Sequence, residues 1–141
     1  MSIRPGKSGS AMQKRSDDIE RYLAQPNLAV LATIGPGDRA HAMPMWYLYE
    51  NGSFVMSTAR GSQKHRNIER HSRATVLVNT QEVPYYAVMV QCKAETGPPL
   101  SPDSRLRMAV RYLGEGPAHE YVSQRLATDS VTIVLQQENI V

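Results

Sequence analysis

The dipeptide Asn51-Gly52 is the feature that most constrains how this chain can fold. Both residue types accept the positive φ angles of a two-residue hairpin turn, so the flanking segments are expected to pair as antiparallel strands. The strand after the turn is expected over residues 53–58 (SFVMST). The strand before it, residues 40–49, places on one of its faces His41, Met43, Met45, Tyr47 and Tyr49.

Further short apolar segments, rich in β-branched residues, predict strands at residues 28–34, 74–79, 86–95 and 130–135. The first of these runs into a Gly-Pro-Gly-Asp turn, and we expect it to form a three-stranded meander with the hairpin. Pro44 has no backbone N–H to donate, which places its strand at a sheet edge or at a bulge.

Helices are expected before and between these strands. Ser16, followed by two aspartates, is a suitable N-cap for a helix ending near Ala24. Apolar spacing and capping residues predict further helices over residues 62–71 and 101–113. A last short helix is expected to start at Pro117 and to carry Tyr121, Val122 and Leu126.

The length of 141 residues suits one domain with one core. Residues 1–15 are rich in Gly, Ser and basic residues, and we interpret them as a flexible N-terminal arm. Residues 16–141 would form the single domain. About six antiparallel strands with short flanking helices predict a mostly β fold, and closure into a small barrel would remove exposed sheet edges.

Cys92 is the single cysteine, and it shares a strand face with Val88 and Val90. We interpret it as a small core residue that does no chemistry. One cysteine excludes an intramolecular disulfide, which suits a reducing compartment. The sequence has neither a secretory apolar region near its start nor a stretch of the roughly 20 apolar residues that span a membrane. A cytoplasmic location without membrane contact is therefore expected.

Positive charge is concentrated in residues 57–73. This window holds five basic residues and one acidic residue, a net +4, whereas the whole chain carries +3. Lys64 and Arg66 fall in the first turns of the expected helix, where the helix dipole disfavours cations. A phosphate would compensate them, because a helix start offers free N–H groups. A solvated basic helix face with Ser62 as an ordinary N-cap explains the same pattern, and without interleaved aromatic residues no nucleic acid is expected.

Four motifs follow one another in the chain: LAVLATI, HAMPMWYLYENG, STARGSQKHRNIERHSRATVLV and PYYAVMVQCKAETG. Their order, over about residues 17–135, resembles the flavin-binding split barrels related to pyridoxamine-phosphate oxidase, including the deazaflavin-dependent branch. The resemblance implies a split β-barrel that works as a homodimer, with the cofactor at the subunit interface. The implied cofactor is FMN or the 8-hydroxy-5-deazaflavin coenzyme, F420.

The resemblance also implies which residues bind the cofactor. Strand-end hydroxyls and a Ser-x-Lys at a helix start hold the phosphate in this family, and these positions are here Ser57, Thr58, Ser62 and Lys64, with Arg60, Arg66 and Asn67 as further candidates. The ring system would lie against Met43, Pro44, Met45, Trp46 and Tyr47. Packing within the core or an interface is the alternative role for Trp46 and the methionines.

The expected function is hydride transfer between a bound flavin or deazaflavin and a small organic substrate. The tail VTIVLQQENIV lacks the C-terminal Arg/His motif of true pyridoxamine-phosphate oxidases, which argues against vitamin B6 oxidation. No catalytic acid or base can be assigned. His65 and His71 fall on different faces of a helix, so no metal site is expected. A non-catalytic flavin-binding, carrier or sensor protein is the alternative.

Overall fold

The computed structural model describes residues 5–125 and 129–141, with side chains from residue 14 onward. The elements are, in chain order, α1 (Pro5–Leu23), β1 (Ala29–Ile34), the 3-10 turn η1 (Pro36–Asp38), β2 (Ala40–Met45), β3 (Leu48–Glu50), β4 (Ser53–Ala59), α2 (Gln63–Arg70), β5 (Arg73–Asn79), β6 (Ala87–Gly97), α3 (Pro102–Leu113), α4 (Glu115–Ser123) and β7 (Ser130–Ile140).

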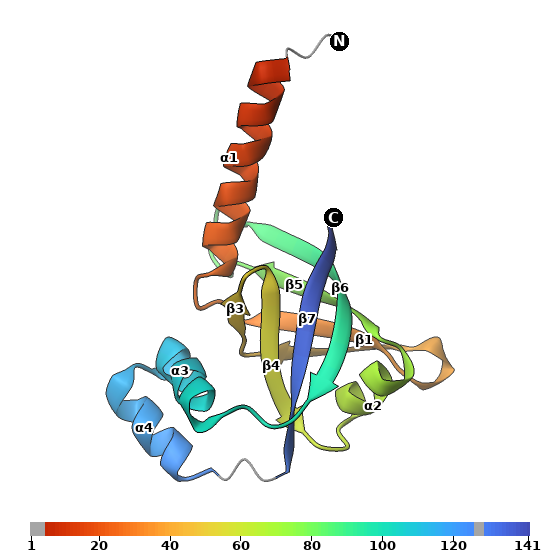
Figure 1. Ribbon diagram of the computed structural model, residues 1–141, viewed down its shortest axis with the longest axis vertical. Helices are drawn as coiled ribbons and strands as arrows, with labels where there is room; N and C mark the ends of the chain where they lie inside the picture. The colour runs from red at the N-terminus through yellow and green to blue at the C-terminus, as the bar shows by residue number, and fades with distance from the viewer. Residues whose placement is uncertain (1–4, 126–128) are drawn as a thin grey trace.

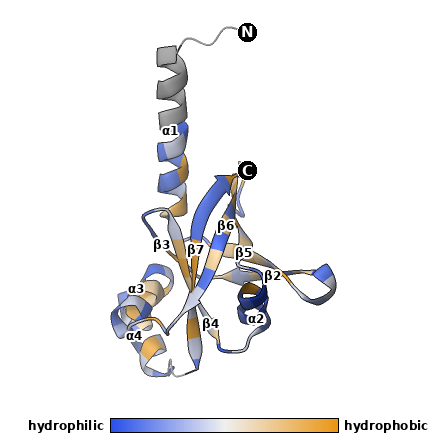
Figure 2. Cartoon of the chain, turned by 45° about the vertical axis from the view of Figure 1, so that its right-hand side comes forward, coloured by the Kyte–Doolittle hydropathy of each residue, from blue (hydrophilic) through white to orange (hydrophobic). Residues whose placement is uncertain are grey.

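The strands form one antiparallel sheet in the order β2-β1-β5-β6-β7-β4-β3, which curls into a half-barrel (Figure 1). Helix α2, which Figure 2 colours as largely hydrophilic, lies near one end of the curled sheet, and α3 and α4 form a helical pair beside β4. The predicted mostly β split barrel with short flanking helices is confirmed. The sheet has seven strands in the described residues instead of about six.

The additional strand arises from a break in the expected strand 40–49. The backbone N–H of Tyr47 donates to the hydroxyl of Tyr112 on α3 (3.0 Å) instead of to a neighbouring strand. The hydroxyl of Tyr47 donates to the carbonyl of Leu23 (2.8 Å), and its ring is completely buried. The chain therefore turns into the core at Tyr47, and β2 and β3 lie at opposite edges of the sheet.

The expected meander of the first three strands is wrong for the same reason. Strand β1 pairs with β2 and β5, whereas β4 pairs with β7 and β3. The hairpin is confirmed, because Asn51 and Gly52 have φ angles of 50° and 78° and Glu50 pairs with Ser53. The edge position predicted from Pro44 is also confirmed, since β2 ends the sheet.

The first helix begins before its predicted start at Ser16. Helix α1 starts at Pro5, so residues 5–15 of the expected arm are helical, and residues 1–4 lie outside the described residues. Proline is favoured at a first helical position, and residues 12–15 (MQKR) are good helix formers that extend the helix. The flexibility of residues 1–15 stays a prediction.

Two other boundaries differ from those expected. Helix α4 begins at Glu115 rather than Pro117, and Leu126 lies outside the described residues. Strand β7 continues past the predicted end at residue 135 to Ile140, because its polar final residues still pair with β6 through the backbone. Backbone hydrogen bonds between strands do not require apolar side chains. The end predicted from hydropathy alone therefore came too early in the chain.

The core fills the concave side of the sheet. It contains alternate residues of the strands, the last turn of α1 (Ile19, Tyr22 and Leu23) and Ile68 of α2. None of the described helices is both long and apolar enough to cross a membrane.

Cys92 belongs to this core, with 1% of its surface exposed. Burial, and then the charge of Glu138, raises the pKa of its thiol from 9.0 to about 12. We expect the native protein to react with a thiol reagent at pH 8 only at the rate of unfolding. A folded pKa above the unfolded one also means that this group's contribution to stability is complete below pH 9.0 and is lost between pH 9.0 and about 12. Rapid labelling in the absence of denaturant would contradict the burial of Cys92.

Candidate functional site

Helix α2 begins at a loop that follows the end of β4. Ser62 is the N-cap, and its hydroxyl accepts a hydrogen bond from the N–H of His65 (3.3 Å). The hydroxyl of Thr58, the last buried residue of β4, lies 3.0 Å from that of Ser62. Gly61 has a φ of 79°, which only glycine adopts without strain. The predicted strand-end and N-cap hydroxyls therefore meet at the start of this helix.

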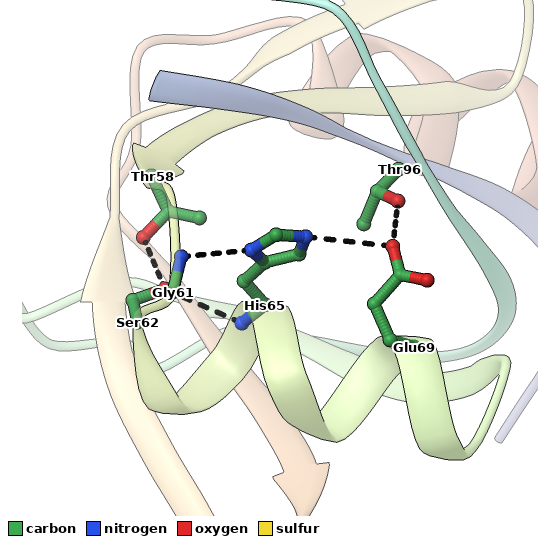
Figure 3. A network of polar contacts seen from close by, with 6 residues as sticks. All are labelled: Thr58, Gly61, Ser62, His65, Glu69 and Thr96. Carbon is green, nitrogen blue, oxygen red and sulfur yellow. Dashed lines mark hydrogen bonds and ion pairs between the residues drawn. The ribbon is translucent and has the colours of Figure 1, made fainter. Parts of the chain in front are cut away.

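His65 and Glu69 hold this loop in place (Figure 3). The N–H of Gly61 donates to Nδ1 of His65 (2.9 Å), which assigns the imidazole proton to Nε2, and Nε2 lies 3.4 Å from the Glu69 carboxylate. The Thr96 hydroxyl donates to the same carboxylate. This hydrogen bond, assisted by His65, lowers the pKa of Glu69. This role of His65 was not predicted, although its spacing to Glu69 indicates an i, i+4 contact.

The cations of α2 have different partners. Arg66 bends back to the carbonyl of Gly61 (2.9 Å) and to the side chain of Gln63 (2.7 Å), and Arg60 is exposed. Lys64 is half-buried and makes no hydrogen bond or ion pair with any described residue. The first turn of the helix has no acidic residue. Lys64, half-buried in the first turn of the helix, thus has no anion among the described residues to neutralise its charge.

Asn67 lies on the inner side of α2 and is completely buried. Its amide nitrogen donates to the hydroxyl of Thr33 on β1 (2.9 Å), and its amide oxygen accepts from Gln63 (2.7 Å). These contacts fasten α2 to β1. The structure therefore gives Asn67 a packing role.

A cleft of about 600 Å³ lies on the other side of β4. It is bounded by the link between β2 and β3, by the outward-facing Ser57 of β4 and by α3 and α4. Of the predicted ring-binding residues, Pro44, Met45 and Trp46 line it. Its volume is in the range of small-molecule sites. Among the described residues that line it, none is acidic, and two are arginines, Arg105 and Arg125.

Trp46, in the lining of this cleft, packs against two tyrosine rings. The ring of Trp46 stacks on Tyr112 with centroids 5.0 Å apart and planes at 9°, and it meets Tyr121 of α4 at 5.4 Å and 43°. The guanidinium of Arg125 lies 4.4 Å from the centroid of the Tyr121 ring. The link after β2 and the α3–α4 pair thus meet through aromatic contacts, and the rings of Trp46 and Tyr121 both line the cleft.

A family model described as pyridoxamine 5'-phosphate oxidase matches residues 16–137 of the chain. This chain belongs to the pyridoxamine 5'-phosphate oxidase family. The resemblance of its motifs to the flavin-binding split barrels is thereby confirmed. No curated protein matches the chain.

Several solved structures share its fold. Protein Rv2991 from Mycobacterium tuberculosis aligns with a TM-score of 0.72 and 23% identity, over 88% of this chain and 81% of that one. An F420 reductase aligns with a TM-score of 0.70 and 22% identity, over 86% and 94%. A FAD-binding protein from Mesorhizobium loti aligns with a TM-score of 0.64 and 16% identity, over 89% of each chain.

In this member of the family, β4 separates the predicted residues into two groups. Ser57 faces the cleft with Pro44, Met45 and Trp46, whereas Thr58 faces inward toward Ser62. Met43 is exposed on β2, next to the cleft-lining residues. Tyr47 lies in the core, where burial and then Tyr112 raise the pKa of its hydroxyl. Tyr47 is therefore a core residue and is not part of the cleft lining.

The outer wall of the cleft was not predicted from the sequence. Arg105, Met108, Tyr121 and Arg125 of the α3–α4 region all line it. Their spacing indicated helices but not which strand those helices cover. Tyr121 is a signal that could have found this wall, because an aromatic residue on a short, polar helix suits a contact surface.

Proposed function

We propose that this chain binds FMN or F420 and transfers hydride between the bound cofactor and a small organic substrate in the cleft. The observation that carries this proposal is a cleft of about 600 Å³, with Trp46 and Tyr121 in its lining, beside the strand end at which Thr58 meets Ser62 at the start of α2. A planar ring that carries a phosphate complements this pair of surfaces. Membership of the pyridoxamine 5'-phosphate oxidase family supports the same class of ligand.

The start of α2 fits the phosphate of either cofactor. It supplies the hydroxyls of Thr58 and Ser62, free N–H groups of the first turn and the unneutralised ammonium of Lys64. Ser57 and Thr58 are consecutive on β4 and point to opposite sides of the strand. The cleft, which Ser57 lines, and the hydroxyls of Thr58 and Ser62 therefore lie on either side of one strand end. A ligand that passes this strand end could reach both.

The cofactor would supply the hydride chemistry when bound. The chain's own residues would orient and shield the reactants. The rings of Trp46 and Tyr121 would contact the planar cofactor or substrate, and Met45 and Met108 would exclude water from the cleft. The lining contains no His, Asp or Glu among the described residues. We therefore assign positioning roles to these side chains and no proton transfer to any of them.

That same lining favours a second candidate function. A cleft without an acid or base suits a protein that stores, carries or senses a flavin without turning over a substrate. The F420 reductase of similar fold is named for an activity, whereas the FAD-binding protein is named for binding only. Oxidation of the reduced, bound cofactor by an added electron acceptor, under anaerobic conditions, would favour the enzyme over the carrier.

Cofactor binding can be measured through Trp46, which is the single tryptophan and lies in the cleft. We expect titration with F420 or FMN to quench its fluorescence to saturation, because a flavin-type ring against the indole accepts its excitation energy. The two cofactors are titrated in parallel, and the tighter one is assigned. Failure of both to bind would remove the ground for the proposed function.

We further propose that the chain forms a homodimer through the outer face of the sheet. Val30 pairs with Pro44 and Leu77, and Leu77 pairs with Met89, so an apolar row crosses four strands outside the core. Met89 is 41% exposed in this row. An exposed apolar row of this kind indicates a protein contact, and a second copy of the chain is the partner we propose.

Sedimentation is expected to give twice the chain mass of 15.7 kDa. A Met89→Glu variant should shift the protein to the monomer, because a buried, unpaired carboxylate opposes association. Leu113→Glu is the matched control, since Leu113 is 36% exposed but lies on α3, away from the row. A monomeric wild-type protein at micromolar concentration would contradict the dimer.

We also propose a cytoplasmic location. The free, buried thiol of Cys92 suits a reducing compartment, in which it has no oxidised partner to meet. Fractionation of the native host cell tests this assignment.

A further inference from the structure

The cleft contains two arginines that no carboxylate neutralises among the described residues. Arg105 donates from Nη2 to the backbone carbonyl of Arg125 (2.6 Å), and Arg125 lies over the ring of Tyr121. Arg107, two residues further along α3, is paired with the carboxylates of Glu50 (2.6 Å) and Asp103 (3.4 Å). The same helix thus neutralises an arginine outside the cleft and leaves one inside it free for an anion.

We propose that Arg105 and Arg125 form a second anion site, which binds the carboxylate of a planar, conjugated organic acid as the substrate. This inference rests on the proposed function, because it assigns the substrate class of the same cleft. Trp46 and Tyr121 supply the surface for the planar body, and the two guanidinium groups supply the charge for its acidic end. Arginine binds carboxylates through two parallel hydrogen bonds, which also orients the acid.

The position of the arginines favours a substrate over the cofactor phosphate. The residues proposed to bind the cofactor phosphate, Thr58, Ser62 and Lys64, lie at the inner side of the β4 end and at the start of α2. The arginines line the outer side, on α3 and just after α4. One phosphate has no need of both sets. The acidic tail of F420 carries the same chemistry as a substrate carboxylate, so the experiment must separate these two sources.

The test compares trans-cinnamate with the neutral trans-cinnamamide by calorimetric titration of the cofactor-loaded protein. We expect cinnamate to bind at least about tenfold more tightly, because only the acid can pair with guanidinium. An Arg105→Gln/Arg125→Gln double variant should lose this preference. Arg107→Gln is the matched control and should keep it, since Arg107 is ion-paired outside the cleft. Equal binding of the two probes by the wild-type protein would overturn the proposal.

A single Arg125→Gln variant guards against misfolding, because Arg125 is exposed and its side chain donates to no described residue. It should lower the preference for cinnamate while the affinities for F420 and FMN stay unchanged. A loss of F420 affinity with the cinnamate preference intact would assign the arginines to the cofactor tail and overturn the proposal. The same titrations are made on the protein without cofactor: a preference for cinnamate in a protein that binds neither cofactor would keep the anion site and contradict the proposed function.

Discussion

Replacing Lys64 with glutamine is expected to weaken cofactor binding at least tenfold while leaving the fold intact. Lys64 is half-buried in the first turn of α2, has no partner among the described residues, and follows the N-cap Ser62 by two residues. A charge-assisted contact to a phosphate contributes about 1.5–3 kcal/mol, and each 1.4 kcal/mol is a factor of about ten in affinity. Because no described contact is lost in the free protein, thermal stability should change little.

Arg70→Gln is the matched control, because it removes the same charge from the last turn of the same helix. Arg70 donates to the carbonyl of Ile34 (2.9 Å), and a glutamine amide can still do so. We expect its effect on the dissociation constant to stay below about threefold at 0.15 M salt, where a distant exposed charge is largely screened. Equal losses from the two variants would replace the specific phosphate site with a diffuse basic surface.

The parts of the fold that could be predicted from the sequence are those with local causes. The hairpin follows from the φ angles of Asn51 and Gly52, and α2 follows from its N-cap, Ser62. The break at Tyr47 could not be predicted, because it depends on the hydroxyl of Tyr112 from a distant helix. The early start of α1 was missed for a different reason: a strong cap at Ser16 does not prevent a helix from beginning upstream.

In the candidate site, too, the features with local causes could be predicted and those that depend on tertiary packing could not. The contact between the hydroxyls of Thr58 and Ser62 could be predicted, because a strand end, a loop and a helix start are contiguous in the chain. The outer wall of the cleft could not, because Arg105, Tyr121 and Arg125 reach it only through the packing of α3 and α4 against β4. The burial of Asn67 could not be predicted either: the family resemblance made it a candidate for phosphate binding, and the structure shows it completely buried, with a hydrogen bond to Thr33.

Arg111 is the residue whose loss should most reduce the stability of the fold. Its guanidinium donates to the carbonyls of Ala24 (2.7 Å), Gln25 (2.5 Å) and Leu23 (3.4 Å) at the end of α1. It also lies 4.8 Å from the centroid of the buried Tyr47 ring. One side chain of α3 therefore satisfies the terminal carbonyls of α1 and packs on the residue at which the β2–β3 link enters the core.

Arg111→Met keeps most of the side-chain volume but removes every donor. We expect it to lower the free energy of unfolding by about 2–4 kcal/mol, because three carbonyls, one of them partly buried, lose a charged partner at once and the contact with the buried Tyr47 ring is lost. Arg107→Met is the control on the same helix, where exposed pairs with Glu50 and Asp103 should contribute less than about 1 kcal/mol. Urea unfolding at one fixed protein concentration measures both variants. Similar midpoints for the two would mean that water replaces the Arg111 contacts at no cost, and that α1 is held to the barrel by its buried apolar residues alone.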